Sequence, residues 1–464
     1  MTKFSERHKR KLKPRKSRKI NLALCCILII VLIPISILVI TIVSQQAEQI
    51  QNNRIKTKYE AGLVGSISKN WILIGHEFTP EQKQFTYTVI STKPEIPDNL
   101  TIQYRIDGEE EFLGSLTRTE PNKYSITLNA EDFGAGVLKL EAVAQSSEVK
   151  GRKWTSEPVS INISYGLYIV WTLDWEGSAV TQEQLNLITK ISDSHHGVPI
   201  TNFFNPRKIG VAQESLQSNY VLGRQQKYGD EIGLHLHMWF DLVQAAGVTV
   251  RKSPAWSSKN NISDSGYDVP CSAYTYEEFT KMLNWSKQEF AKKGLGTPIS
   301  FRAGGWYLSL DNVKSLQDAG FKIDSSGRDA RFWGTGYIAS PWSLGSRTQP
   351  YKISKENLNS DYPSPRYDIW EMPNNAADSF WFSAQDMITA MNDNFPNGEP
   401  LKERSISIIL SHPNTFTMDY PKINAFYIDA DSKFYAENKG PIIYTTLAKY
   451  YEILTTDPNP KYVD

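Results

Sequence analysis

Cysteine is scarce in this sequence of 464 residues, which contains only three. Cys25 and Cys26 lie next to each other in an apolar segment, and Cys271 is alone in the remainder. No disulfide within the chain can therefore stabilise the part beyond that segment, which must be held together by hydrophobic cores. The length predicts more than one domain, and the hydrophobic fraction of 40% is typical of a folded protein.

The sequence also lacks a strong net charge, since the formal total is only +1 at pH 7. The charge is unevenly distributed, because residues 1–19 contain ten lysines and arginines against a single acid, Glu6, and so carry +9. All the other residues together therefore carry −8. An acidic folded part argues against nucleic acid as its partner, and that class of function is excluded.

Charged residues are absent from residues 22–43, a run of 22 residues. A helix of that length spans the ~30 Å hydrocarbon core of a bilayer. We therefore expect a transmembrane helix at residues 20–43, with the basic tip at residues 1–19 in the cytoplasm. A cleaved signal peptide is the alternative, but its apolar stretch is normally about 7–15 residues long. The sequence predicts a single-pass membrane protein with the rest of the chain outside.

Beyond the membrane segment, the residue pattern divides the chain into three parts. Residues 44–61 are polar and are interpreted as a stalk. Residues 62–165 consist of short runs that alternate apolar and polar residues, which predicts an all-β, immunoglobulin-like sandwich. Residues 166–464 alternate strand and helix patterns, which predicts an α/β domain with a parallel sheet, either open or closed as a barrel.

Several signals predict the elements of this α/β part. Capping boxes at residues 181–184 and 275–278 predict the starts of two helices, and residues 441–454 have a helix-like pattern. Two long irregular stretches, at about 240–273 and 327–367, each follow a predicted strand. Loops of that length in a compact domain usually carry function.

Polar residues stand at the carboxyl ends of several predicted strands, where parallel α/β folds bind their ligands. Asp174 and Glu176 follow the first strand, Arg302 ends another, and His412 follows a late one. Each of them alone has an ordinary explanation, since a single histidine is more often structural and a D-x-E sequence is often a helix cap or a turn. Taken together they favour a functional site.

The pair His235-x-His237 is a sharper signal. Residues two apart in a strand point to the same side, so both imidazoles can reach one ion. With a carboxylate added, the set is typical of catalytic zinc sites that keep positions open for water.

The order of these motifs resembles that of the NodB-homology polysaccharide deacetylases of carbohydrate esterase family 4, over about residues 166–452. The similar segments are, in chain order, TLDWEG, GVPITNFF, EIGLHLH, FRAGGW, GFKIDSS, IWEMP and LSHP. The resemblance implies a distorted (β/α)7 barrel. It also implies a divergent branch, because Trp175 replaces the usual second aspartate and the usual H-x-x-x-H is shortened to H-x-H.

The resemblance further implies a role for each residue. Asp174 would be the general base that deprotonates the attacking water, His412 the general acid that protonates the departing amine, and Arg302 the residue that orients Asp174. A divalent metal, expected to be zinc, would be held by a carboxylate and two imidazoles: Glu176, His235 and His237. The enzyme would be a hydrolase of carbon–nitrogen bonds other than peptide bonds, and its partner an acetylated polysaccharide.

Four tryptophans lie in or beside these motifs: Trp175, Trp239, Trp306 and Trp370. Aromatic faces commonly stack on sugar rings, so these residues are candidates for substrate binding. Packing at the rim of the core is an equally open alternative.

The sequence thus predicts a membrane-anchored, metal-dependent hydrolase that removes N- or O-acetyl groups from an extracellular or envelope polysaccharide. One alternative is a non-catalytic glycan-binding protein on the same fold. The other is a glycoside hydrolase on a related (β/α)7 scaffold, which would need two carboxylates across the scissile bond and no metal.

Overall fold

The computed structural model describes four stretches of the chain: residues 62–92, 101–145, 153–330 and 337–458. The basic tip, the transmembrane helix and the stalk that we expect within residues 1–61 lie outside the described residues. Within the described stretches, no helix is both long enough and apolar enough to cross a membrane.

The chain forms two compact units. The smaller one includes Val89–Tyr124 and Glu141–Pro158, and the larger one consists of Ser66–Thr88, Ser125–Leu140 and Val159–Asp464. All the residues of the candidate site belong to the larger unit. The domain boundary that we expect at residue 165 stays a prediction.

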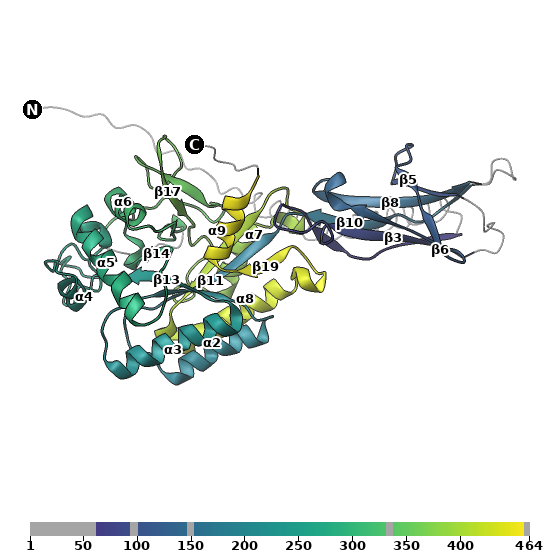
Figure 1. Ribbon diagram of the computed structural model, residues 1–464. Helices are drawn as coiled ribbons and strands as arrows, with labels where there is room; N and C mark the ends of the chain where they lie inside the picture. The colour runs from purple at the N-terminus through teal and green to yellow at the C-terminus, as the bar shows by residue number, and fades with distance from the viewer. Residues whose placement is uncertain (1–61, 93–100, 146–152, 331–336, 459–464) are drawn as a thin grey trace, which may run out of the picture. The chain divides into compact units, whose positions relative to one another are not determined.

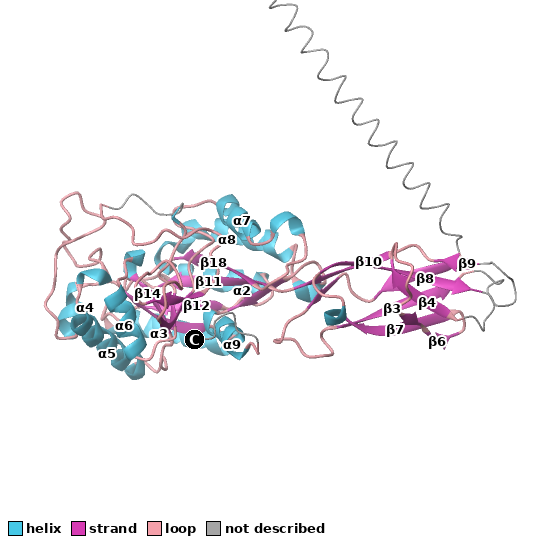
Figure 2. Ribbon diagram, turned by 90° about the horizontal axis from the view of Figure 1, so that it is seen from above, coloured by secondary structure: helices cyan, strands magenta, loops and turns pink. Residues whose placement is uncertain are grey.

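The described part of residues 62–165 contains strands and one short 3-10 turn, η1 (Ala130–Asp132). One sheet has four strands in the order β1-β3-β7-β6, and a second has the order β2-β10-β8-β4-β5 with β9 beside β8 (Figure 2). The strands have these bounds: β1 Leu63–Ile67, β2 Trp71–Leu73, β3 Gln84–Ser91, β4 Ile102–Ile106, β5 Gly114–Ser115, β6 Thr117–Glu120, β7 Lys123–Asn129, β8 Gly136–Gln145, β9 Lys153–Thr155 and β10 Val159–Ser164. The all-β prediction is confirmed for the described residues, and the immunoglobulin-like arrangement stays a prediction.

The α/β prediction is confirmed by a nine-stranded sheet in the order β16-β17-β15-β14-β13-β12-β11-β18, with β19 also paired to β11 (Figure 1). Its strands have these bounds: β11 Leu167–Asp174, β12 Ile200–Phe204, β13 Glu231–Leu236, β14 Ser300–Ala303, β15 Ile323–Asp324, β16 Tyr351–Ser354, β17 Arg366–Glu371, β18 Ser405–Ser411 and β19 Ile442–Thr445. All neighbours are parallel except β16 and β17. In the described chain β16 and β18 end this strand order, and the backbone of residues 376–379 hydrogen-bonds to β18. The sheet is a curled half-barrel, and the distorted (β/α)7 barrel stays a prediction.

Helices flank this sheet in both views (Figures 1 and 2). They have these bounds: α2 Gln182–Ser194, α3 Val211–Tyr228, α4 Phe240–Ala245, α5 Tyr276–Lys292, α6 Leu310–Asp318, α7 Ala384–Asp393, α8 Phe416–Asp431 and α9 Leu447–Thr456. Both predicted capping boxes are present, since Thr181 caps α2 and Thr275 caps α5. The apolar face of α2 is fully buried, as the spacing of its leucine and isoleucines predicts.

The helix-like pattern at residues 441–454 is only partly correct. Its first half is strand β19, which pairs with Leu167–Val170 of β11. This half is rich in β-branched residues, which fit a pleated sheet better than a helix. The helix begins only after Thr446, whose side chain accepts a hydrogen bond from the backbone N–H of Lys449.

Candidate metal and catalytic site

The polar residues singled out in the sequence converge at the carboxyl edge of the large sheet. Asp174 ends β11, and His235 of β13 lies in register with Arg302 of β14. Glu176, His237 and His412 come directly after β11, β13 and β18, and parallel strands bring these ends to one edge. All of these residues except Arg302 line a cavity of about 320 Å³.

Glu176 stands at the centre of this cavity, among three imidazoles. Its Oε2 lies 2.5 Å from Nε2 of His237, and its Oε1 lies 3.2 Å from Nε2 of His412 and 3.7 Å from Nε2 of His235. Burial alone would raise the pKa of Glu176, but His237, His235 and His412 hold it well below its usual value. The carboxylate is therefore charged and available as a ligand.

The other ring nitrogens of the two strand histidines face backbone carbonyls. Nδ1 of His235 is 2.9 Å from the carbonyl oxygen of Arg302, and Nδ1 of His237 is 2.7 Å from that of Tyr267. A carbonyl only accepts, so Nδ1 carries the proton and the lone pair lies on Nε2. Metal-binding histidines are usually held in this way.

This arrangement fits a metal ion. Glu176, His235 and His237 each offer a ligand atom, and these atoms lie within 4.8 Å of one another. In the described chain Nε2 of His235 is buried and has no hydrogen-bond partner, which is costly unless another group uses it. One carboxylate and two imidazoles are the ligand set of many catalytic zinc sites.

Asp174 is held from behind by Arg302. Nη1 of Arg302 donates to Oδ1 of Asp174 at 2.9 Å and to the hydroxyl of Thr172 at 2.7 Å. Its other nitrogens donate to the carbonyl oxygen and the hydroxyl of Ser325. Arg302 is completely buried, so its guanidinium group is fixed and cannot swing away from the carboxylate.

Behind His412 lies a carboxylate that the sequence reasoning missed. Oδ1 of Asp378 is 3.7 Å from Nδ1 of His412, and Asp378 is 1% exposed. Burial alone would lower the pKa of His412, but the charges of Asp378, Glu176 and Asp174 raise it to about 10. Asp378 lies after β17, in a segment with no regular residue pattern. Its place between two strands was the only feature of the sequence that set it apart from other aspartates.

Tyr267 is a second residue that was missed. Its hydroxyl donates to Oε2 of Glu176 at 2.9 Å, and its ring stacks on that of His237 with the centroids 4.0 Å apart. It belongs to the long stretch at residues 240–273, which was expected to carry function without any residue being specified.

The four tryptophans have different environments. Trp239 donates from Nε1 to the backbone oxygen of Glu176, and Trp306 lines the cavity with its own Nε1 unpaired within the described chain. Trp175 is 2% exposed and donates to Asn202, so it is a core residue and its expected contact with substrate is wrong. Its side chain points to the face opposite Asp174 and Glu176, because successive residues of an extended chain alternate.

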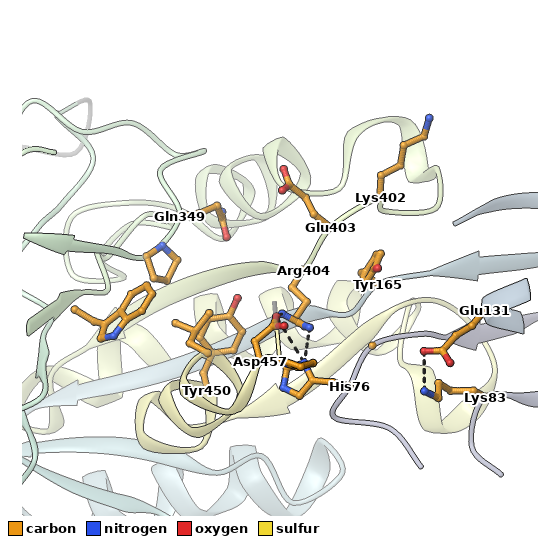
Figure 3. A pocket seen from close by; sticks show the side chains of 15 residues that line it. His76, Lys83, Glu131, Tyr165, Gln349, Lys402, Glu403, Arg404, Tyr450 and Asp457 are labelled. Atoms are coloured by element: carbon orange, nitrogen blue, oxygen red, sulfur yellow. Dashed lines mark hydrogen bonds and ion pairs between the residues drawn. The ribbon is translucent and has the colours of Figure 1, made fainter. Parts of the chain in front are cut away.

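Trp370 lies away from the metal and catalytic residues. It lines a separate cavity of about 510 Å³ in the larger unit and is not among the residues that line the cavity around Glu176, so a substrate contact of Trp370 stays a prediction. In that second cavity Arg404 donates to Asp457 and lies 2.7 Å from Nδ1 of His76 (Figure 3). Arg404 also donates to Glu77. The charge of Arg404 is therefore paired with the carboxylates of Glu77 and Asp457.

Different aromatic residues surround the catalytic cavity. Phe380 and Trp381 line it and are 37% and 65% exposed, and Trp256 lines it as well. The rings of Phe380 and Trp381 are 4.8 Å apart, nearly perpendicular to each other. Exposed aromatic side chains next to a polar cavity are suited to contact a sugar ring.

The chain is similar, at low sequence identity, to solved structures of carbohydrate esterase family 4 and of polysaccharide and peptidoglycan deacetylases. No family model and no curated protein matches the sequence. Similar solved structures include a protein from Mycobacterium smegmatis classed provisionally as a polysaccharide deacetylase, with 12% identity and a TM-score of 0.40, over 64% of this chain and 94% of that one.

Two further structures belong to the same family. A family 4 acetyl xylan esterase from Clostridium thermocellum, solved with a cobalt ion, has 12% identity and a TM-score of 0.31, over 62% of this chain and 91% of that one. A family 4 pseudoenzyme from Bacillus anthracis has 11% identity and a TM-score of 0.32, over 61% of this chain and 65% of that one.

Proposed function

We propose that the protein is a membrane-anchored, metal-dependent hydrolase that removes acetyl groups from an extracellular or envelope polysaccharide. The observation that carries the proposal is the convergence of Glu176, His235 and His237, with both Nδ1 atoms occupied by carbonyl oxygens and both Nε2 atoms turned to the carboxylate. A zinc ion bound by these residues would polarise an acetyl carbonyl and make a water more acidic.

Asp174 is proposed as the general base. Arg302 binds its Oδ1 and leaves Oδ2 to accept the proton of the attacking water. The fixed guanidinium group holds the carboxylate in one orientation and stabilises its negative charge, so the base does not need to reorganise during the reaction.

His412 is proposed as the general acid. Its Nε2 faces the cavity beside Glu176, and Asp378 lies on the side of Nδ1. A protonated imidazole there can donate to the departing nitrogen or oxygen as its bond to the acetyl carbon breaks. The proton that Asp174 takes from water and the proton that His412 gives to the leaving group balance the hydrolysis.

The substrate is proposed to be a polysaccharide because of the rim of the cavity. Phe380 and Trp381 offer aromatic faces to a sugar ring, and Trp306 lines the same cavity. The same aromatic faces would also serve a glycan-binding protein without catalysis, which is the second candidate.

Acetate release separates the two candidates. We would incubate the purified protein with N-acetylated chitin oligomers and with O-acetylated xylan, each with and without a chelator. A deacetylase releases acetate from one of them, and both the chelator and Asp174→Asn abolish the release. Glycan binding without any acetate release would favour the second candidate.

The membrane anchor is proposed from the apolar run at residues 22–43 and the basic tip before it. Mass spectrometry of the protein extracted from membranes tests this directly. An anchored chain keeps the peptides of residues 1–19, whereas a mature protein that begins after residue 43 would contradict the anchor.

A further inference from the structure

Tyr267 touches two of the proposed metal ligands in three ways. Its hydroxyl donates to Oε2 of Glu176 at 2.9 Å, and its backbone oxygen lies 2.7 Å from Nδ1 of His237. Its ring lies parallel to the imidazole of His237, with an angle of 2° between the planes and 4.0 Å between the centroids. No pattern in the sequence indicates a residue with these contacts.

Each contact fixes a different property of the ligands. The backbone oxygen keeps the proton of His237 on Nδ1, and the stacked ring holds the plane of the imidazole. The hydroxyl donates to Oε2 of Glu176, the oxygen that also lies 2.5 Å from Nε2 of His237, whereas Oε1 faces His235 and His412. The hydroxyl therefore fixes the orientation of the carboxylate among the imidazoles.

The backbone just before Tyr267 packs closely against the segment that follows β13. The backbone oxygen of Ser265 accepts a hydrogen bond from the N–H of Phe240 at 2.9 Å, just beyond β13. Gly266 has φ +85°, and a Cβ there would lie 2.2 Å from the backbone oxygen of Met238. Only glycine allows this approach, which brings Tyr267 next to the end of the strand.

We infer that Tyr267 is a positioning residue of the metal site, which fixes the orientation of the Glu176 carboxylate and holds His237 in its coordinating orientation. The inference rests on the proposed function, because it assigns Tyr267 to the metal that this function requires. Groups that orient metal ligands typically change metal affinity by about 10- to 100-fold when they are removed.

The test is the affinity of the metal-free protein for Zn²⁺, measured by isothermal titration calorimetry. Tyr267→Phe removes the hydroxyl and keeps the stacked ring, so we expect zinc to bind about 10- to 100-fold more weakly while the metal-free protein stays folded. Tyr267→Ala also removes the ring and should weaken binding further. Tyr444→Phe is the matched control, because that hydroxyl also donates to a carboxylate, that of Asp431 at 2.6 Å. It should leave zinc affinity unchanged.

The visible spectrum of bound Co²⁺ gives a second readout, which depends on the coordination geometry. Because the Glu176 carboxylate can turn once the hydroxyl is gone, we expect the cobalt bands of Tyr267→Phe to shift from those of the wild type. If Tyr267→Phe has the zinc affinity and the cobalt spectrum of the wild type, the inference about Tyr267 is overturned and the proposed function is not affected. A wild-type protein that binds no metal would overturn the proposed function, and the two failures are thus distinguishable.

Discussion

Nη1 of Arg302 lies 2.9 Å from Oδ1 of Asp174, and the two side chains are 0% and 3% exposed. A buried positive charge needs a fixed negative partner, because neither ion can recover its hydration. The ion pair therefore ties Asp174, the proposed general base, to the centre of the sheet, since Arg302 belongs to β14 and Asp174 to β11.

Removing Arg302 should lower both the free energy of unfolding and the rate of acetate release. In Arg302→Met the charge of Asp174 loses its partner, and breaking a buried pair in this way costs about 3–5 kcal/mol. Chemical denaturation measures the loss. Lys227→Met is the control, because its ion pair with Asp193 is exposed and should contribute less than about 1 kcal/mol. Equal losses in the two variants would show that Arg302 is not the electrostatic partner described here.

Removing the proposed acid should affect turnover and spare the metal. His412→Ala is expected to slow acetate release by about 10²- to 10⁴-fold, the usual contribution of general acid catalysis, with zinc content unchanged. Acetate assays and elemental analysis on the same preparation test both parts. His196→Ala serves as the control, since His196 is outside the site and pairs with Asp431 and Glu437. A normal rate in His412→Ala would assign His412 a structural role.

Truncation of two tryptophans should affect different properties of the protein, substrate binding in one case and stability in the other. Trp381→Ala should raise KM for a polymeric substrate by about 2- to 10-fold with little change in kcat or stability, because its ring is 65% exposed. Trp175→Ala removes a core side chain and should lower the free energy of unfolding by about 3–5 kcal/mol. Steady-state kinetics and denaturation compare them. An unchanged KM in Trp381→Ala would remove it from the substrate site.

The fold was predictable where the residue pattern is regular. The strand ends that carry Asp174, His235 and Arg302 follow from apolar runs and their polar termini, and the capping boxes fix the starts of two helices. Alternation alone could also have shown that Trp175 points to the core, since it stands between two residues that share the opposite face. The sugar-binding interpretation overlooked that argument.

The missed residues lie where no periodic pattern exists. Tyr267 and Asp378 reach the site from irregular segments, and their contacts depend on the path of the backbone. The approach at Gly266 is one example, because it requires a positive φ and contact with the backbone of Met238. A single sequence without a regular pattern does not indicate such a path.

Away from the site, His195 and Asp431 should give stability a pH dependence. Nδ1 of His195 is 2.7 Å from Oδ2 of Asp431. Burial lowers the pKa of His195, but the hydrogen bonds to Asp431 and Asn424 outweigh it and raise that pKa above its ordinary value. The folded state thus favours protonated His195, and this stabilisation is present below about pH 6.5 and is lost as the pH rises through the folded-state pKa.

Asp431→Asn should therefore lower the free energy of unfolding more at pH 5.5 than at pH 8.5. Urea denaturation at the two pH values measures the difference. Asp193→Asn is the control, because its partners Lys227 and Tyr228 do not titrate in this range. A loss for Asp431→Asn that is the same at both pH values would contradict the assignment.

The zinc content of the purified protein and of two carboxylate variants tests the central claim most directly. Wild type and Asp174→Asn should each hold about one ion per chain, because Asp174 is the base and not a ligand, whereas Glu176→Ala should hold little. No zinc in the wild type would contradict the metal site. Zinc lost from Asp174→Asn and retained in Glu176→Ala would reverse the two roles.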